Sequence, residues 1–422
     1  MQELKYKEYG TVITKKSCVV VVEGLKNCIY GQLVDMGAGS TGLIIGFTEK
    51  VAQILVLTEK KPISAGDRVS TVLKPFNVPV GNNYLGRITT VLGTPRDNMG
   101  PIEPDEYLPV FRDSPAIMDR GPVERTLETG IKIIDSMIPM GCGQRELLTG
   151  DRMSGKTTIG TDTILNQKGK GVICIYVDIG KAESQLKRVS SLFQRHGASE
   201  YTIIVSAGAS CSQGEQFLAP FVACSMGEYF MFQGKDVFVV FDDFTKHAWA
   251  YRELSLLLHR PPGRNAYPGD VFYLHSQMIE RAAQLSEEKG GGSMTFLPLM
   301  ESLEGDITSY VITNLVSMTD GQIVLDLGLA ADGFMPALDL GLSVSRIGTK
   351  VQWKIMKQLT ASYRLDYLQH KELEEATKLQ SDPTKEVLEQ LKFGNILIEL
   401  ITQDKDDPID MEKQVFMYYA QN

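Results

Sequence analysis

Short apolar runs follow one another closely over the first seventy or so residues, and a turn signal closes each of them. Glycine, asparagine, aspartate or a Lys-Pro pair bounds the runs, which have the composition and length of β-strands. Several short strands at this spacing predict a small closed β-barrel over residues 1–74. The predicted strands cover residues 18–22, 31–35, 41–47, 51–57 and 67–72.

The middle of the chain changes to an alternation of strand and helix patterns. It begins with a connecting segment rich in proline and glycine, residues 75–125. Further on, short apolar runs of the kind buried in parallel sheets are separated by helical stretches. The pattern predicts an α/β domain with a mostly parallel sheet over residues 75–350. Its predicted strands include residues 172–177, 202–206, 237–241 and 323–325.

Beyond residue 350 the strand pattern stops and helical spacing begins. Apolar residues recur at intervals of about four, as in Tyr363 and Tyr367. The pair Asp382-Pro383 has the residue types that cap and open a helix. A third, α-helical domain is therefore predicted over residues 351–422, with helices at 352–379 and 384–401.

Composition and charge exclude several classes of protein. The chain has 422 residues, of which 43% are hydrophobic and 23% charged, so it is not of a disordered class. Its net charge of −9 argues against a broad nucleic-acid-binding surface. The six cysteines lack the spacing of a zinc site or a disulfide framework, which favours a reduced, intracellular compartment. The sequence has no signal peptide and no apolar run of about 18 residues, so membrane contact is expected only through partners.

One octapeptide carries the strongest chemical signal, because it matches the phosphate-binding pattern Gly-x-x-x-x-Gly-Lys-Ser/Thr. Leu147 and Leu148 before it predict a buried strand, and residues 158–165 after it predict a helix whose N-terminus faces the phosphates. The alternative is a glycine-rich turn with a solvated lysine, but the strand–loop–helix setting favours nucleotide binding. The predicted nucleotide-binding residues are Gly150, Asp151, Arg152, Met153, Ser154, Gly155, Lys156, Thr157 and Thr158.

A second element of such a site follows at the end of another apolar strand. Residues 237–241 lead directly into Asp242, and a carboxylate at this place can hold hydrated Mg²⁺ together with the Thr157 hydroxyl. The alternative for Asp242 is a helix cap at a strand end. The metal role is preferred because two independent elements agree.

These residues and their neighbours give the chain a resemblance to the α subunits of rotary F-type ATP synthases over nearly its whole length. The most specific stretches are residues 137–157, Arg260-Pro261-Pro262-Gly263-Arg264, residues 266–275 and 342–348. The resemblance implies a β-barrel crown, a RecA-like nucleotide domain that binds ATP or ADP with Mg²⁺, and a C-terminal helical domain. It also implies three copies alternating with three catalytic β-type subunits around a γ-type central stalk, with a peripheral stalk as a further contact. The expected location is the cytoplasmic face of the cell membrane or its organelle equivalent.

The resemblance also predicts that the chain's own site is inactive. Catalytic β-type chains carry a glutamate, and typical α chains a glutamine, where this chain has Lys181 after the strand at 172–177. A charged ammonium is a donor only and cannot accept a proton from the attacking water. The alternative is that Lys181 points to solvent and Glu183 takes the part of the base.

Arg346 is the residue that the resemblance assigns to catalysis, in a neighbouring subunit. In the family, the arginine of the Ser-Val-Ser-Arg block reaches across the interface to the γ-phosphate held by the catalytic subunit. Such a guanidinium stabilises charge on the transferring phosphoryl group. Ser343 and Ser345 resemble positions that hold this loop, with plain turn hydroxyls as their alternative, and an interface salt bridge is the alternative for Arg346.

Departures from the family concern the base of the nucleotide. Ala330 and Met335 stand where typical α chains have an aromatic residue and an arginine around adenine. Met153 and Lys405 replace two glutamines, whereas Gln403 matches the family and is a further predicted nucleotide ligand. Phe334 could substitute for the missing ring from a neighbouring position. We expect phosphate binding to be retained and purine affinity to be weakened.

Two further hypotheses belong to other functional classes. One is a self-sufficient hexameric ATPase resembling secretion and flagellar motors, and the other is a degenerate regulatory paralogue of a specialised F-like assembly. The sequence starts close to the predicted barrel and stops at Asn422, whereas family members usually carry an N-terminal extension and further C-terminal helices. A shortened helical domain is therefore expected.

Overall fold

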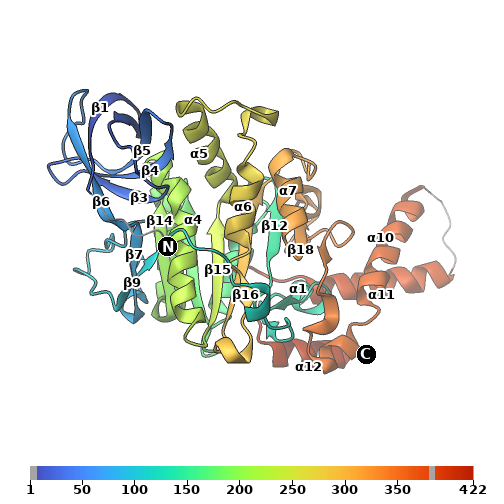
Figure 1. Cartoon of the computed structure of the whole chain (residues 1–422). Helices are drawn as coiled ribbons and strands as arrows, with labels where there is room; N and C mark the ends of the chain where they lie inside the picture. The colour runs from blue at the N-terminus through green and yellow to red at the C-terminus, as the bar shows by residue number, and fades with distance from the viewer. Residues whose placement is uncertain (1–6, 380–384, 422) are drawn as a thin grey trace.

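The computed structural model describes residues 7–379 and 385–421, and three parts follow one another along the chain (Figure 1). The first part is a closed barrel of antiparallel strands in the order β1-β2-β5-β4-β3-β6, which confirms the predicted barrel. Its first strand was not predicted, because Gly10 and Val12 are its only fully buried residues. The strands are β1 (Tyr9–Lys16), β2 (Val19–Glu23), β3 (Gln32–Asp35), β4 (Thr41–Phe47), β5 (Val51–Thr58) and β6 (Arg68–Pro75).

The connecting segment, residues 75–125, contains short strands that pair with one another or with the central sheet. β7 (Asn77–Val80) pairs with β9 (Glu106–Pro109), and β8 (Ile88–Thr89) joins the edge of the central sheet. A second small sheet pairs β10 (Thr126–Leu127) with β11 (Met140–Gly141). The segment therefore extends the central domain.

The second part is a sheet of nine strands in the order β19-β18-β12-β17-β15-β13-β14-β8, with β16 paired to β17. The strands from β18 to β8 run parallel, and β16 and β19 are antiparallel to their neighbours. The mostly parallel sheet that the sequence predicts is thus confirmed. The remaining strands are β12 (Glu146–Gly150), β13 (Ile173–Ile179), β14 (Thr202–Ala207), β15 (Asp236–Asp242), β16 (Ala283–Gln284), β17 (Ser293–Glu301), β18 (Gly321–Leu325) and β19 (Val344–Ser345).

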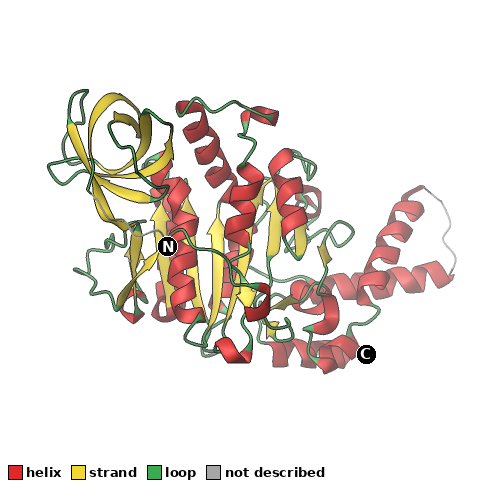
Figure 2. Cartoon of the chain, in the orientation of Figure 1, coloured by secondary structure: helices red, strands yellow, loops and turns green. Residues whose placement is uncertain are grey.

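Two hydrophobic cores lie on the two faces of this sheet. Alternate residues of β13 enter different cores, Ile175 on one face and Tyr176 on the other, as the pleat of a strand requires. Helices cover both faces (Figure 2). They are α1 (Lys132–Met137), α2 (Lys156–Leu165), α3 (Glu183–His196), α4 (Gln213–Met231), α5 (Phe244–Leu257), α6 (Val271–Ile279), α7 (Tyr310–Met318) and α8 (Leu327–Ala331).

The third part is helical, as predicted. The helix expected over 352–379 is divided in two. Thr360 lies between the two helices, and its hydroxyl is within hydrogen-bond distance of the carbonyls of Ser136 and Met356. The cap predicted at Asp382-Pro383 lies outside the described residues. No helix in the described ranges is both long and apolar enough to span a bilayer. The helices are α9 (Lys354–Leu359), α10 (Tyr363–Leu379), α11 (Lys385–Ile401) and α12 (Met411–Gln421), with 3₁₀ turns elsewhere at Asn82–Tyr84, Ile117–Asp119, Ala198–Tyr201, Arg264–Ala266, Glu287–Lys289 and Gly348–Lys350.

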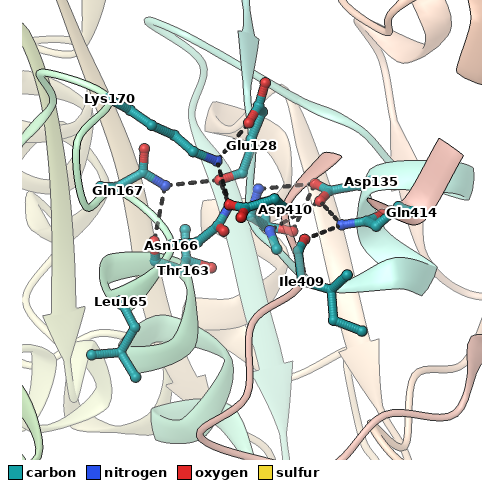
Figure 3. A network of polar contacts seen from close by, with 12 residues as sticks. Glu128, Asp135, Thr163, Leu165, Asn166, Gln167, Lys170, Ile409, Asp410 and Gln414 are labelled. Atoms are coloured by element: carbon teal, nitrogen blue, oxygen red, sulfur yellow. Dashed lines mark hydrogen bonds and ion pairs between the residues drawn. The ribbon is translucent and has the colours of Figure 1, made fainter. Parts of the chain in front are cut away.

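A buried polar network joins the helical part to the nucleotide domain (Figure 3). Asp135 of α1 accepts hydrogen bonds from the Thr129 hydroxyl at 2.8 Å and from Gln414 Nε2 of α12 at 2.8 Å. Burial raises the pKa of Asp135 to about 6. Near the end of α2, Lys170 pairs with Glu128 at 2.5 Å. The last helix is therefore fixed against the segment that leads into the phosphate-binding elements.

Candidate nucleotide-binding site

The phosphate-binding octapeptide lies between β12 and α2, at the edge where the parallel strands have their carboxyl ends. Two glycines are needed for its shape. Gly155 has a φ of 102°, in the left-handed region that favours glycine. A Cβ at Gly150 would lie 2.7 Å from Ser154 Oγ and 2.8 Å from Leu325 Cβ. The loop can therefore turn tightly and present its N–H groups to an anion at the N-terminus of α2.

Lys156 opens α2 and lies folded over the loop. Its ammonium donates hydrogen bonds to the carbonyls of Gly150 at 2.7 Å and Asp151 at 2.6 Å. Burial lowers the pKa of Lys156. These contacts keep a cation at the mouth of the loop, where a phosphate oxygen can replace a carbonyl as its partner.

The residues inside the loop divide into anchors and an exposed tip. Asp151 accepts hydrogen bonds from the Ser302 hydroxyl at 2.7 Å and from the Gly305 backbone at 3.0 Å, and Arg152 pairs with Glu301. Ser154 is buried, whereas Met153 is 99% exposed. The end of β17 and the segment after it therefore hold the loop in place, which local sequence patterns could not indicate.

Asp242 at the end of β15 accepts hydrogen bonds from elements that lie far apart in the sequence. Its Oδ2 accepts from the Thr157 hydroxyl at 2.7 Å and from the Tyr176 hydroxyl at 2.6 Å. The Lys181 ammonium pairs with its Oδ1 and donates to Thr157 Oγ1 at 3.1 Å. The helix cap that was the alternative for Asp242 is supplied by its neighbour Asp243, whose side chain accepts from the Thr245 backbone at 2.8 Å.

Thr157 and Asp242 lie together, as the prediction of a Mg²⁺ site requires, but they do not fit a hydrated Mg²⁺. Both side chains already contact the Lys181 ammonium. A Mg²⁺ ion at its usual distance of about 2.1 Å from Thr157 Oγ1 would lie within about 5 Å of that ammonium. At an effective dielectric constant of about 20, this repulsion amounts to several kcal/mol.

The position that would activate water holds no proton acceptor. Lys181 follows β13, as the sequence predicted, and its ammonium faces Asp242 instead of solvent. Glu183, the alternative base, pairs with Arg96 of the connecting segment. Its carboxylate is thereby engaged by an arginine that also donates to the Ser206 hydroxyl at 3.0 Å.

A cavity of about 280 Å³ opens beside the loop, and Met335, Gln403 and Lys405, which were predicted around the nucleotide base, are among its lining residues. No aromatic ring and no arginine is among its lining residues, which leaves the apolar Met335 and Pro336 as the surfaces nearest to a stacking partner. The lining residues are Ile131, Ser154, Gly155, Thr158, Ile159, Asp162, Met335, Pro336, Gln403, Asp404 and Lys405.

Two of the residues predicted around the base have other contacts. Gln403 lines the cavity, but its Oε1 accepts from the Lys132 backbone at 2.9 Å and its Nε2 donates to the Gly130 carbonyl at 2.9 Å. Phe334 is buried against Tyr367, with 5.7 Å between the ring centroids, and does not line the cavity. Phe334 therefore does not replace the missing ring from this position.

Asp162 is a residue of the cavity that the sequence analysis missed. It lies on α2, is only 4% exposed and accepts a hydrogen bond from the Asp406 backbone at 3.2 Å. Burial, with the charges of Asp406 and Asp407, raises its pKa to about 7. Asp162 lies four residues after Thr158 on α2, so helical spacing from this predicted residue was the available signal, but the facing backbone comes from a segment about 240 residues away.

Arg346 lies at the opposite edge of the sheet from the phosphate-binding loop. The strand before it pairs Ser345 with Gly321, which in turn pairs with Glu146, the first residue of β12. Glu146 and Gly150 are about 13 Å apart along the strand, and Arg346 continues away from the loop. The exposed Arg346 side chain therefore cannot serve the chain's own site.

Hydroxyl groups shape the loop that carries Arg346. Ser343 Oγ accepts from the Val324 backbone at 2.9 Å, and Ser345 Oγ accepts from the Gly348 backbone at 3.1 Å. Arg364 of α10 adds hydrogen bonds to the carbonyls of Leu340 at 2.8 Å and Ser343 at 2.7 Å. Arg364 was not predicted, since nothing near it in the sequence points to this loop.

Comparisons with known proteins agree with this architecture. Residues 130–345 match the nucleotide-binding domain of the ATP synthase alpha/beta family, and residues 352–422 match the C-terminal domain of its alpha/beta chains. ATP synthase subunit alpha of Caldanaerobacter subterraneus subsp. tengcongensis is 47% identical over 413 residues, which cover 98% of this chain and 82% of the relative. The alpha subunits of Clostridium botulinum and Petrotoga mobilis are 47% and 46% identical, and each alignment covers 99% of this chain and 83% of the relative. The chain belongs to the ATP synthase alpha/beta family, and within that family to the alpha subunits.

Proposed function

We propose that this chain is the non-catalytic, nucleotide-binding alpha subunit of an F-type ATP synthase, and that its Arg346 completes the catalytic site of a neighbouring beta-type subunit. In such an assembly, three copies alternate with three catalytic subunits around a gamma-type central stalk. The ring couples ATP synthesis or hydrolysis to ion transport and meets the membrane only through other subunits.

The observation that carries this proposal is the ion pair between Lys181 and Asp242. Hydrolysis needs a group that accepts a proton from water or orients it, and an ammonium cannot accept one. Glu183 is paired elsewhere. Phosphate binding is supported by the glycine geometry of the loop and by Lys156 at its mouth.

The position of Arg346 supports a role in trans. The residue is exposed, its loop is held by Ser343, Ser345 and Arg364, and it lies far from the phosphates that its own chain would bind. An exposed guanidinium on a loop held in this way suits the stabilisation of charge on a phosphoryl group that a neighbouring subunit transfers.

The test is Arg346→Ala in a ring reconstituted from this chain and its catalytic partner. The turnover number for ATP is expected to fall by about 10³-fold or more, as for other arginine fingers, while assembly and the ATP affinity of the isolated alpha chain stay unchanged. Arg68→Ala is the matched control, because Arg68 is an exposed arginine of the barrel. An unchanged turnover number would favour the regulatory paralogue, and phosphate release by the isolated wild-type chain would favour the self-sufficient ATPase.

A further inference from the structure

Two oxygen donors that a divalent cation would use are already bridged by a cation of the protein itself. The Lys181 ammonium pairs with Asp242 Oδ1 and lies 3.1 Å from Thr157 Oγ1. Thr157 and Asp242 are in turn joined by a hydrogen bond of 2.7 Å. The three groups therefore contact one another pairwise at the end of the phosphate-binding octapeptide.

The carboxylate and the ammonium of these three groups are largely shielded from solvent. Asp242 is 1% exposed, and the side chain of Lys181 is 17% exposed. Tyr176 donates to the second carboxylate oxygen at 2.6 Å, so both oxygens of Asp242 have partners. A buried carboxylate requires a nearby positive charge or several donors, and here the ammonium supplies the charge.

The Lys181 ammonium has the properties that phosphates require from a counter-ion. It carries three donors and a positive charge: it forms an ion pair with Asp242 Oδ1, donates one hydrogen bond to Thr157 Oγ1, and keeps at least one donor for a further partner. The remaining donor can bind a phosphate oxygen. Mg²⁺ would need near-octahedral oxygen ligands in the same place, and it would meet the ammonium within about 5 Å.

We propose that Lys181 replaces the divalent cation of this site, so that the chain binds a nucleoside di- or triphosphate as the free anion, without Mg²⁺. The inference rests on the proposed nucleotide-binding function and specifies the form of the ligand. The positive charge at the β- and γ-phosphates then comes from Lys156 and Lys181. Addition of Mg²⁺ does not tighten binding, because it converts free nucleotide into a complex whose metal meets the Lys181 charge.

The experiment is an isothermal titration of the purified full chain with ATP, once in excess Mg²⁺ and once in a chelator. For the wild type, Mg²⁺ is expected to tighten binding by less than about threefold. Lys181→Gln removes the charge and retains a polar side chain, and Mg²⁺ is expected to tighten its binding by about tenfold or more. Lys181→Arg retains the charge and the independence of Mg²⁺. Lys187→Gln, at an exposed position on α3, is the matched control and behaves like the wild type.

The possible failures are distinct. Wild-type binding that Mg²⁺ tightens by threefold or more overturns the inference and leaves the nucleotide-binding function intact. Equal responses of the wild type and a folded Lys181→Gln variant overturn it as well. Absence of ATP binding in both buffers overturns the proposed function itself. Mn²⁺ electron paramagnetic resonance adds a direct measurement on the wild type alone, with no protein-bound Mn²⁺ expected in the presence of ATP.

Discussion

The two ends of the nucleotide site are built in different ways. At the phosphate end, a contiguous loop, Lys156 and the Asp242–Lys181 pair form a connected set of hydrogen bonds and charges. At the base end, segments from four parts of the chain surround a cavity whose apolar surface comes from residues such as Met335 and Pro336. From this difference we expect the phosphates to supply most of the affinity and the base to be held loosely.

The largest expected effect is at the phosphate end. Lys156→Ala removes a cation that can bind the phosphates, and the affinity for ATP is expected to fall about 100-fold, which is a typical loss for a charge-assisted contact. Isothermal titration measures it, with Lys187→Ala as the exposed control. A loss below about threefold would contradict the division between the two ends.

A buried acid gives the base end a pH-dependent stability. The pKa of Asp162 is raised to about 7 in the folded chain, from an ordinary value near 3.8, so its contribution to stability is full below about pH 4 and is lost as the pH rises through 7. Asp162→Asn does not titrate and can still accept from the Asp406 backbone. The variant is expected to gain about 2 kcal/mol over the wild type between pH 5 and pH 8.

Thermal unfolding at several pH values measures this gain. The melting temperature of Asp162→Asn minus that of the wild type should increase with pH. Asp404→Asn is the control, because it removes the same charge from an exposed position on the same cavity. A difference that stays constant from pH 5 to pH 8 would show that Asp162 is ionised throughout this range.

The smallest expected effect tests whether the base end can be strengthened. Met335→Tyr adds a ring to the cavity, and stacking on adenine is expected to tighten ATP binding about fivefold, or about 1 kcal/mol. Inorganic tripolyphosphate has no base, so its affinity should stay the same in parallel titrations. Met118→Tyr, at a site 89% exposed, is the matched control. Equal tightening of both ligands would mean that the added ring acts on the phosphate end.

Much of the architecture was predictable because its signals are local. The barrel strands, the parallel sheet and the phosphate-binding loop are all marked by short-range patterns. The central strand β17 was missed, since Pro298 interrupts it and proline usually marks an edge strand. In the structure, Pro298 is paired in register with Phe241 in the middle of the sheet.

The candidate site was predictable only as far as its parts are contiguous. The octapeptide and the strand-end Asp242 were identified, and Lys181 was correctly expected after its strand. The contact of Lys181 with Thr157 and Asp242 depends on the packing of three separate elements, which no pattern along the chain contains. Phe334 shows the same limit, because its burial against Tyr367 follows from the tertiary fold.

The hydrogen bonds from Arg364 have a mechanical consequence under the proposed function. They tie α10 to the carbonyls of Leu340 and Ser343, a few residues before Arg346. A tilt of the helical part would therefore be transmitted as a shift of the guanidinium at the neighbour's phosphates. Torque that the central stalk exerts on these helices would thus reach the neighbour's reacting phosphates in part through the Arg364 side chain.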